Sequence, residues 1–136
     1  MPLSDAYEDT TLDHILGTTE LTFVTDVFIA LGTDASPNKT TFTECQVPGT
    51  GGYSRQAATF AASSGGVATN SSGTHTFGAC SGTAWGTLKS FALWKDETAT
   101  ATANRIIQGA LTDQTKVVGI GDSVTIAAGA ISVTAT

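Results

Sequence analysis

The run of residues 23–31 is the most apolar stretch of this chain, and it restricts the possible fold more than any other feature. It is rich in β-branched and aromatic residues, which favour extended strands. Alternate side chains would line one face of such a strand: Phe23, Thr25, Val27, Ile29 and Leu31. The other face carries Val24 and Phe28, so we expect a central strand with neighbours packed over both faces. Gly32 and the turn-forming residues of 34–38 would end it.

Short alternating segments, separated by Gly- and Ser-rich turns, continue along the chain. They cover residues 41–47, 53–61, 67–70, 74–77, 83–94, 105–111, 116–118, 123–128 and 130–134. No segment between them has the pattern of a helix that would join parallel strands. The sequence therefore predicts an all-β fold, a β-sandwich or barrel of about eight short antiparallel strands. A length of 136 residues suits one such domain.

One short helix is predicted near the N-terminus, over residues 4–16. Ser4 is placed to cap it, acidic residues fill the first turns where the helix dipole favours them, and Gly17 is placed to end it. The apolar side of this helix is narrow: Leu12, Ile15 and Leu16, with Tyr7 and Leu3. We expect this stripe to pack on a sheet or on another subunit. The chain would then divide into an N-terminal helix or arm over residues 1–20 and a β domain over residues 21–136.

The net charge of −6 is distributed unevenly along the chain. No Lys or Arg precedes Lys39, whereas seven acidic residues do. One interpretation is chance in a weakly charged chain. The other is an acidic N-terminal element that meets a basic partner or the basic middle of a neighbouring copy. The lack of clustered cations argues against nucleic-acid binding.

The sequence also argues against a membrane partner. No apolar run reaches membrane-spanning length, and Met1 is followed by polar and acidic residues where a secretory leader has a basic and then an apolar region. We therefore expect no membrane contact, and synthesis in a cytoplasm.

The residues that carry chemistry are few and scattered. His14 and His75 have no partner at metal-ligand spacing, and Cys45 and Cys80 form no CxxC motif. We expect solvated or dipole-satisfied histidines and buried thiols. We expect no catalytic or metal-binding residues, and no cofactor.

Two large aromatic residues, Trp85 and Trp94, fit two interpretations. They are either core residues or anchors of an interface. With the helix they complete our set of candidate interface residues: Leu3, Tyr7, Glu8, Leu12, Ile15, Trp85 and Trp94.

An ordered set of short motifs extends over nearly the whole chain. The motifs are Leu3-Ser4-Asp5, Leu12-Asp13-His14-Ile15-Leu16-Gly17, Val27-Phe28-Ile29-Ala30-Leu31, Gly52-Tyr53-Ser54-Arg55-Gln56, Trp85-Gly86-Thr87, Phe91, Gly109-Ala110-Leu111-Thr112, Lys116-Val117, Gly121-Asp122 and Ala127-Ala128-Gly129-Ala130-Ile131. In this set the chain resembles a family of small tailed-phage virion proteins, whose members are described as tail-fibre-like or head decoration proteins. It departs from the family at Pro37 and Asn38 and in the Thr- and Ala-rich stretch 98–103.

The resemblance implies a structural component of the virion that is not an enzyme and is assembled in the host cytoplasm. We expect a capsid cement or decoration protein that binds the outer surface of the shell and stabilises it through many weak contacts. Its partner would be the major capsid protein, its location the capsid exterior, and its assembly a homotrimer, because capsid lattices present threefold positions. The alternative is a tail or tail-fibre component that contacts the host surface.

Overall fold

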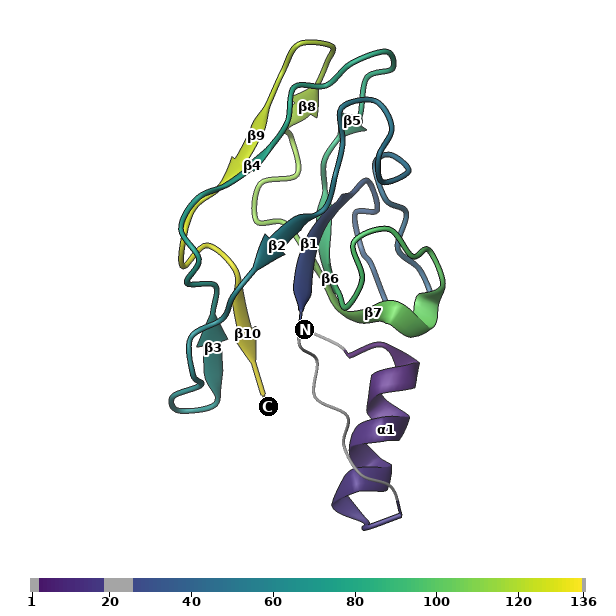
Figure 1. Ribbon diagram of the computed structural model, residues 1–136, viewed down its shortest axis with the longest axis vertical. Coiled ribbons are helices and arrows are strands. Elements are labelled where there is room, and N and C mark those ends of the chain that lie inside the picture. Colours follow the sequence, from purple (N-terminus) through teal and green to yellow (C-terminus); the bar gives the residue numbers. More distant parts are fainter. Residues whose placement is uncertain (1–2, 19–25, 136) are drawn as a thin grey trace.

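The computed structural model describes residues 3–18 and 26–135 (Figure 1). These residues form one helix, one short 3-10 turn and ten strands. The elements are α1 (Asp5–Ile15), β1 (Val27–Gly32), β2 (Gln56–Ala58), β3 (Val67–Thr69), β4 (His75–Phe77), β5 (Gly86–Thr87), β6 (Ser90–Trp94), η1 (Thr102–Asn104), β7 (Arg105–Ala110), β8 (Val117–Val118), β9 (Val124–Ile126) and β10 (Ser132–Thr134). The predicted all-β fold with one short N-terminal helix is confirmed.

One four-stranded sheet, in the order β2-β1-β6-β7, forms the centre of the molecule. Three two-stranded ladders, β3 with β10, β4 with β9 and β5 with β8, complete the fold, and all the strand pairs are antiparallel. Figure 1 shows the β4–β9 and β3–β10 ladders along one side of the central sheet. Apolar side chains of both layers, among them Ile29, Phe77 and Ile131, share one core cluster.

Strand β1 is an inner strand of this sheet, as its sequence predicts. Ile29 and Leu31 belong to the larger core cluster on one face, and Ala30 belongs to a smaller cluster with Ala92 and Trp94 on the other. Both faces are therefore covered, which explains why the run is apolar almost throughout. The first part of the predicted strand, residues 23–25, lies outside the described residues.

The prediction of a strand over residues 41–47 is wrong. Of this segment, Glu44 makes a single isolated bridge with Gly32, and the remainder is loop. The Asn38 carboxamide oxygen accepts hydrogen bonds from the backbone N–H groups of Thr40 and Thr41, and the Asp34 carboxylate accepts one from Thr43. Side chains thus occupy backbone donors that a strand would use, and this favours a turn.

A second difference concerns residues 83–94, which the sequence predicts as one strand region. The structure divides them into β5 and β6, which belong to different sheets. Gly86 has a φ of +81°, a left-handed conformation outside the range of a regular strand. The predicted strand at 53–61 is likewise shorter, since β2 covers only Gln56–Ala58.

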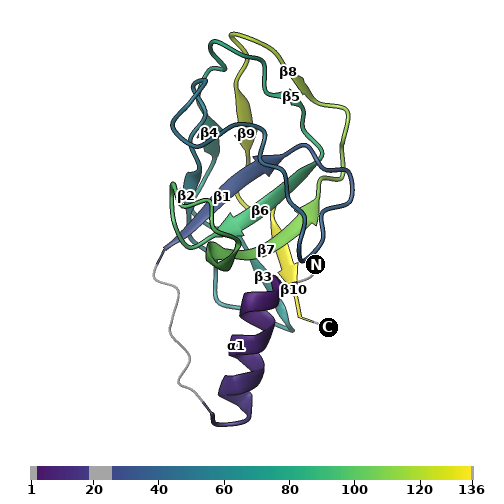
Figure 2. The same cartoon turned by 90° about the vertical axis from the view of Figure 1, so that its right-hand side faces the viewer.

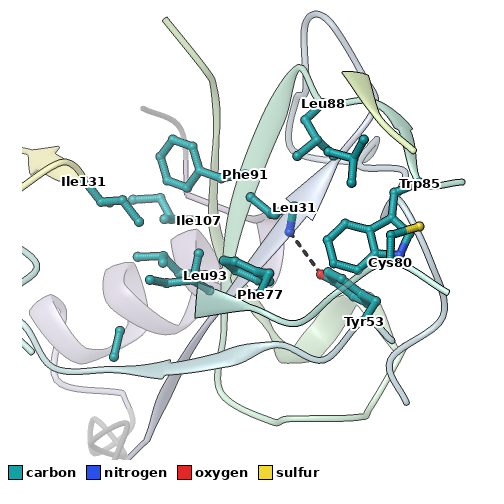
Figure 3. Packing of buried hydrophobic residues seen from close by; sticks show 13 residues of the cluster. Leu31, Tyr53, Phe77, Cys80, Trp85, Leu88, Phe91, Leu93, Ile107 and Ile131 are labelled. Carbon is teal, nitrogen blue, oxygen red and sulfur yellow. Dashed lines mark hydrogen bonds between the residues drawn. The ribbon is translucent and has the colours of Figure 1, made fainter. Parts of the chain in front are cut away.

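The core is built around Tyr53, a residue of the loop that precedes β2 (Figure 3). Its ring stacks on Phe77 at a centroid distance of 6.0 Å and meets Trp85 edge to face at 5.4 Å. Its hydroxyl oxygen accepts a hydrogen bond from the Leu31 backbone N–H at 3.0 Å. This aromatic group therefore joins the loop before β2 to the central sheet.

Candidate attachment surface

Helix α1 projects from one end of the β domain, opposite the β5–β8 ladder (Figures 1 and 2). Two residues that precede the helix hold it to the edge strand β7. Leu3 forms a β-bridge with Ile107, and the Ser4 backbone N–H donates to the Ile106 carbonyl oxygen at 3.0 Å. The Ser4 hydroxyl donates to the Arg105 carbonyl oxygen at 2.5 Å. Ser4 occupies the N-cap position, but its hydroxyl makes no capping bond, so the predicted side-chain cap is wrong.

The first turns of α1 also contact the β domain. The Glu8 carboxylate forms an ion pair with Lys39, and the pKa of Lys39 is raised chiefly by this hydrogen-bonded contact. The Lys95 ammonium lies 6.0 Å from the centroid of the Tyr7 ring, and partial burial raises the pKa of Tyr7. Three of the candidate interface residues, Leu3, Tyr7 and Glu8, thus hold the root of the helix within this chain.

The large apolar side chains at the far end of α1 are exposed. Leu12 is 55 % exposed, Ile15 72 % and Leu16 67 %, and the helix has no buried residue. Two acidic residues of the same helix, Asp9 and Asp13, are exposed as well. We call Leu12, Ile15 and Leu16 the helix tip. An exposed group of large apolar side chains is a typical feature of a protein-binding surface.

The last two candidate interface residues are core residues. Trp85 is 2 % exposed and Trp94 is 4 % exposed, so neither ring is presented at the surface of this chain. The Trp85 Nε1–H donates to the Gly51 carbonyl oxygen at 2.9 Å, as a buried indole requires. The sequence left open whether these two residues are core residues or interface anchors. In the structure both are core residues.

In the part of the chain that the structure describes, the histidines and cysteines form neither a disulfide nor a metal-binding cluster. His75 is buried and its Nε2 lies 3.0 Å from the Ser72 hydroxyl oxygen, so of the two predicted alternatives, solvated or dipole-satisfied, the solvated one is wrong at this position. Cys80 is buried and Cys45 is half-buried, and both are free thiols. Burial is the main reason that the pKa of Cys45 is raised to about 12. Within residues 3–18 and 26–135, no three His, Cys, Asp or Glu residues come together where a metal ion could bind.

A buried ion pair was not anticipated from the sequence. The Arg55 side chain is fully buried and binds the Glu44 carboxylate twice, from Nε to Oε1 at 2.9 Å and from Nη2 to Oε2 at 2.7 Å. Its guanidinium carbon lies 3.9 Å from the centroid of the Trp94 ring. The signal in the sequence was alternation, which places Arg55 on the same face as Tyr53 and so toward the core.

Within the described segments, no helix is both long enough and apolar enough to cross a membrane.

A second exposed apolar pair, Val117 and Ile120, lies at or beside β8, at the end of the molecule opposite α1 (Figure 1). The structure therefore carries exposed apolar side chains at both of its ends.

Comparison with known proteins identifies one family. A family model described as "Podophage GP4 fiber I protein gp80" matches residues 2–134. The match covers nearly all of the described structure, including α1 and every strand. No curated protein matches the chain.

Proposed function

Because the chain belongs to the podophage GP4 fiber I protein family, and is thus a structural protein of a phage virion, we propose that it is a fibre component that α1 attaches to the particle. The observation that carries this proposal is the exposed helix tip. It belongs to a helix whose root is held to β7 while its far end projects from the domain (Figure 2).

The chemistry of α1 favours a particular partner. An amphipathic helix binds by laying its apolar stripe into a hydrophobic groove. The stripe at Leu12, Ile15 and Leu16 is accompanied by acids on the same helix, of which Asp5, Asp9 and Asp13 are exposed. A groove with an apolar floor and a basic rim would complement both features. The partner would then be another virion protein.

The same charges disfavour a bundle made of copies of this helix. Asp5, Glu8, Asp9 and Asp13 would be brought close together if several copies packed side by side, and like charges at close range repel. A homotrimer stays a prediction, and contacts elsewhere on the chain would have to stabilise it.

A capsid decoration protein is the second candidate function, with the major capsid protein as partner and the capsid exterior as location. It is favoured by the small β domain with one projecting helix, because such a unit can be repeated over a shell where many weak contacts add together. The two candidates differ in stoichiometry. Densitometry of purified virions would give few copies per particle for a fibre component and many for a decoration protein.

The attachment is tested by changing the helix tip without disturbing the fold. Leu12→Gln, Ile15→Gln and Leu16→Gln, made together, remove the apolar stripe while keeping good helix formers. We expect the variant to fold, with an unchanged circular dichroism spectrum and thermal midpoint, and to be missing from virions produced by a phage that carries it.

The matched control changes the exposed apolar residues at the other end, with Val117→Gln and Ile120→Gln made together. We expect this control to enter virions at the level of the unmodified chain. Normal incorporation of the helix-tip variant would overturn the proposal that α1 is the attachment surface.

A further inference from the structure

A groove lies between the end of the central sheet and strand β9. It consists of two adjoining cavities of about 370 and 310 Å³, which share Leu111, Thr125 and Ile126 as lining residues. Leu111 follows β7, and the other two residues belong to β9. Buried residues of the larger core cluster form the floor: Leu31, Leu88, Phe91 and Ile131. We call this feature the β9 groove.

The accessible lining of the β9 groove is mainly apolar. Leu111, Val124 and Ile126 are half-buried, and Ala110 and Ala127 are exposed. The described residues that line the larger cavity are all uncharged. Apolar side chains that remain accessible in a hollow of this kind are typical of a protein-binding surface.

The charges beside the groove are mainly basic. Four of the six Lys and Arg residues contact other parts of the chain: Lys39, Arg55, Lys95 and Arg105. The remaining two lie at the groove, since Lys116 lines the smaller cavity and the Lys89 carbonyl oxygen accepts a hydrogen bond from the Leu111 N–H at 2.8 Å. Neither has an ion-pair partner among the described residues. Asp113 also lines the smaller cavity, but its Oδ1 accepts two hydrogen bonds from Thr115.

Helix α1 has the complementary surface. Leu12, Ile15 and Leu16 are three and four residues apart, so they lie on one face of a single helical turn. Exposed carboxylates at Asp9 and Asp13 accompany them. The helix points away from its own domain (Figures 1 and 2), so the helix tip of one copy is placed to reach another copy and not its own groove.

We propose that the β9 groove of one copy binds the helix tip of a second copy. The apolar stripe lies against Leu111, Val124 and Ile126, and the acids of α1 face Lys89 and Lys116. Two different surfaces meet, so the contact is head to tail and gives a ring or an open row of copies. In an open row, the helix of the first copy stays available for the particle. This inference rests on the proposed role of the helix tip as the attachment surface.

Self-association of the isolated full chain is the first measurement. One helical turn in a short groove is a small contact, so we expect a dissociation constant on the order of 100 µM, visible by sedimentation velocity between about 10 µM and 1 mM. The helix-tip variant should stay monomeric over this range. Thr125→Glu, an exposed position in the groove that would face the acids of α1, should stay monomeric as well.

The matched control for the groove variant is Thr59→Glu. Thr59 is exposed, lines neither cavity of the groove and follows β2, at the opposite edge of the central sheet from β7. It adds the same negative charge to the chain, so we expect it to associate as the unmodified chain does. Circular dichroism reports whether each variant is folded. Lys116→Glu is a second groove variant, and we expect it to weaken association several-fold.

Mixing the two defective variants tests the head-to-tail contact. The helix-tip variant has an intact groove and Thr125→Glu has an intact helix, so we expect the mixture to form a one-to-one heterodimer. A contact between two helices or between two grooves would not be restored in this mixture. In the ¹⁵N-labelled helix-tip variant, the backbone signals of Leu111 and Ile126 should shift when unlabelled Thr125→Glu is added.

Three results would overturn this inference: an unmodified chain that is monomeric at 1 mM, a mixture that does not associate, or signal shifts confined to residues outside the groove. If one of them is found while the helix-tip variant is still missing from virions, attachment to the particle stands and the second copy is excluded as the partner. If the helix-tip variant enters virions normally, attachment to the particle fails, whatever the sedimentation result.

Discussion

At the scale of single residues, the two ion pairs of the described structure differ in burial. The Arg55 side chain is fully enclosed and Glu44 is nearly so, whereas Lys39 and Glu8 face solvent. Removing one partner of a buried pair leaves the other charge uncompensated, which costs about 3–5 kcal/mol. We therefore expect Glu44→Gln to lower the free energy of unfolding by about 3 kcal/mol, the lower end of this range, because the Gln side-chain oxygen can still accept hydrogen bonds. Urea denaturation measures this change.

Glu8→Gln is the matched control for that prediction, because it makes the same chemical change at the exposed pair with Lys39. Exposed pairs contribute little, since water and salt screen them. Equal losses of stability in the two variants would show that Arg55 is not held as a buried charge.

At the scale of secondary structure elements, the sequence predicted what depended on local pattern. The run at β1 was predicted as a central strand because apolar side chains on both faces leave few alternatives. The segment 41–47 alternates equally well, yet it forms a loop because Asn38 and Asp34 bind its backbone N–H groups. Such bonds depend on where a turn places two side chains, and alternation contains no information about that.

The candidate interface shows the same limit. The sequence grouped Leu3, Tyr7, Glu8, Leu12 and Ile15 because they belong to one helix segment. Which of them contact the domain depends on how the residues before the helix pair with β7, and that pairing joins positions about a hundred residues apart, such as Ser4 and Arg105. Long-range pairing of this kind cannot be derived from periodicity.

Two glycines of the loop between β1 and β2 provide the next prediction. Gly52 has a φ of +73°, and a Cβ atom there would lie 2.0 Å from the Ala79 carbonyl oxygen. Gly49 has a φ of +86° but has no atom within 4 Å of such a Cβ. Alanine at either position would cost about 1–2 kcal/mol for the left-handed backbone. At Gly52 the backbone of Ala79 must also move.

We therefore expect Gly52→Ala to lower the free energy of unfolding by about 2 kcal/mol more than Gly49→Ala does, which is typical of overpacking. Chemical denaturation of the two variants side by side measures the difference. Equal stability of the two would mean that the approach of Gly52 to Ala79 is not as close as in this structure.

At the scale of the whole molecule, the β domain lies between two exposed apolar ends, the helix tip and the residues around β8 (Figure 1). The central sheet and its core hold these ends apart, and the ladder β5–β8 is continuous with that core through Val118 and Leu88. This arrangement suits a protein that attaches to a neighbour through the helix tip at one end. The predicted division into an arm over residues 1–20 and a domain over residues 21–136 would then also be a functional division.

Deleting residues 1–20 tests that division. No residue of α1 is buried, so the deletion removes little core. It does remove the Leu3 bridge and the two hydrogen bonds that Ser4 donates to β7, which leaves two carbonyl oxygens to bind water. At about 0.5–1.5 kcal/mol for each hydrogen bond, we expect the free energy of unfolding to fall by about 1–3 kcal/mol. The truncated chain should still unfold in one cooperative transition, and it should be missing from virions. A chain that is unfolded after the deletion would instead show that α1 is part of the folding unit, and the loss from virions would then have no bearing on attachment.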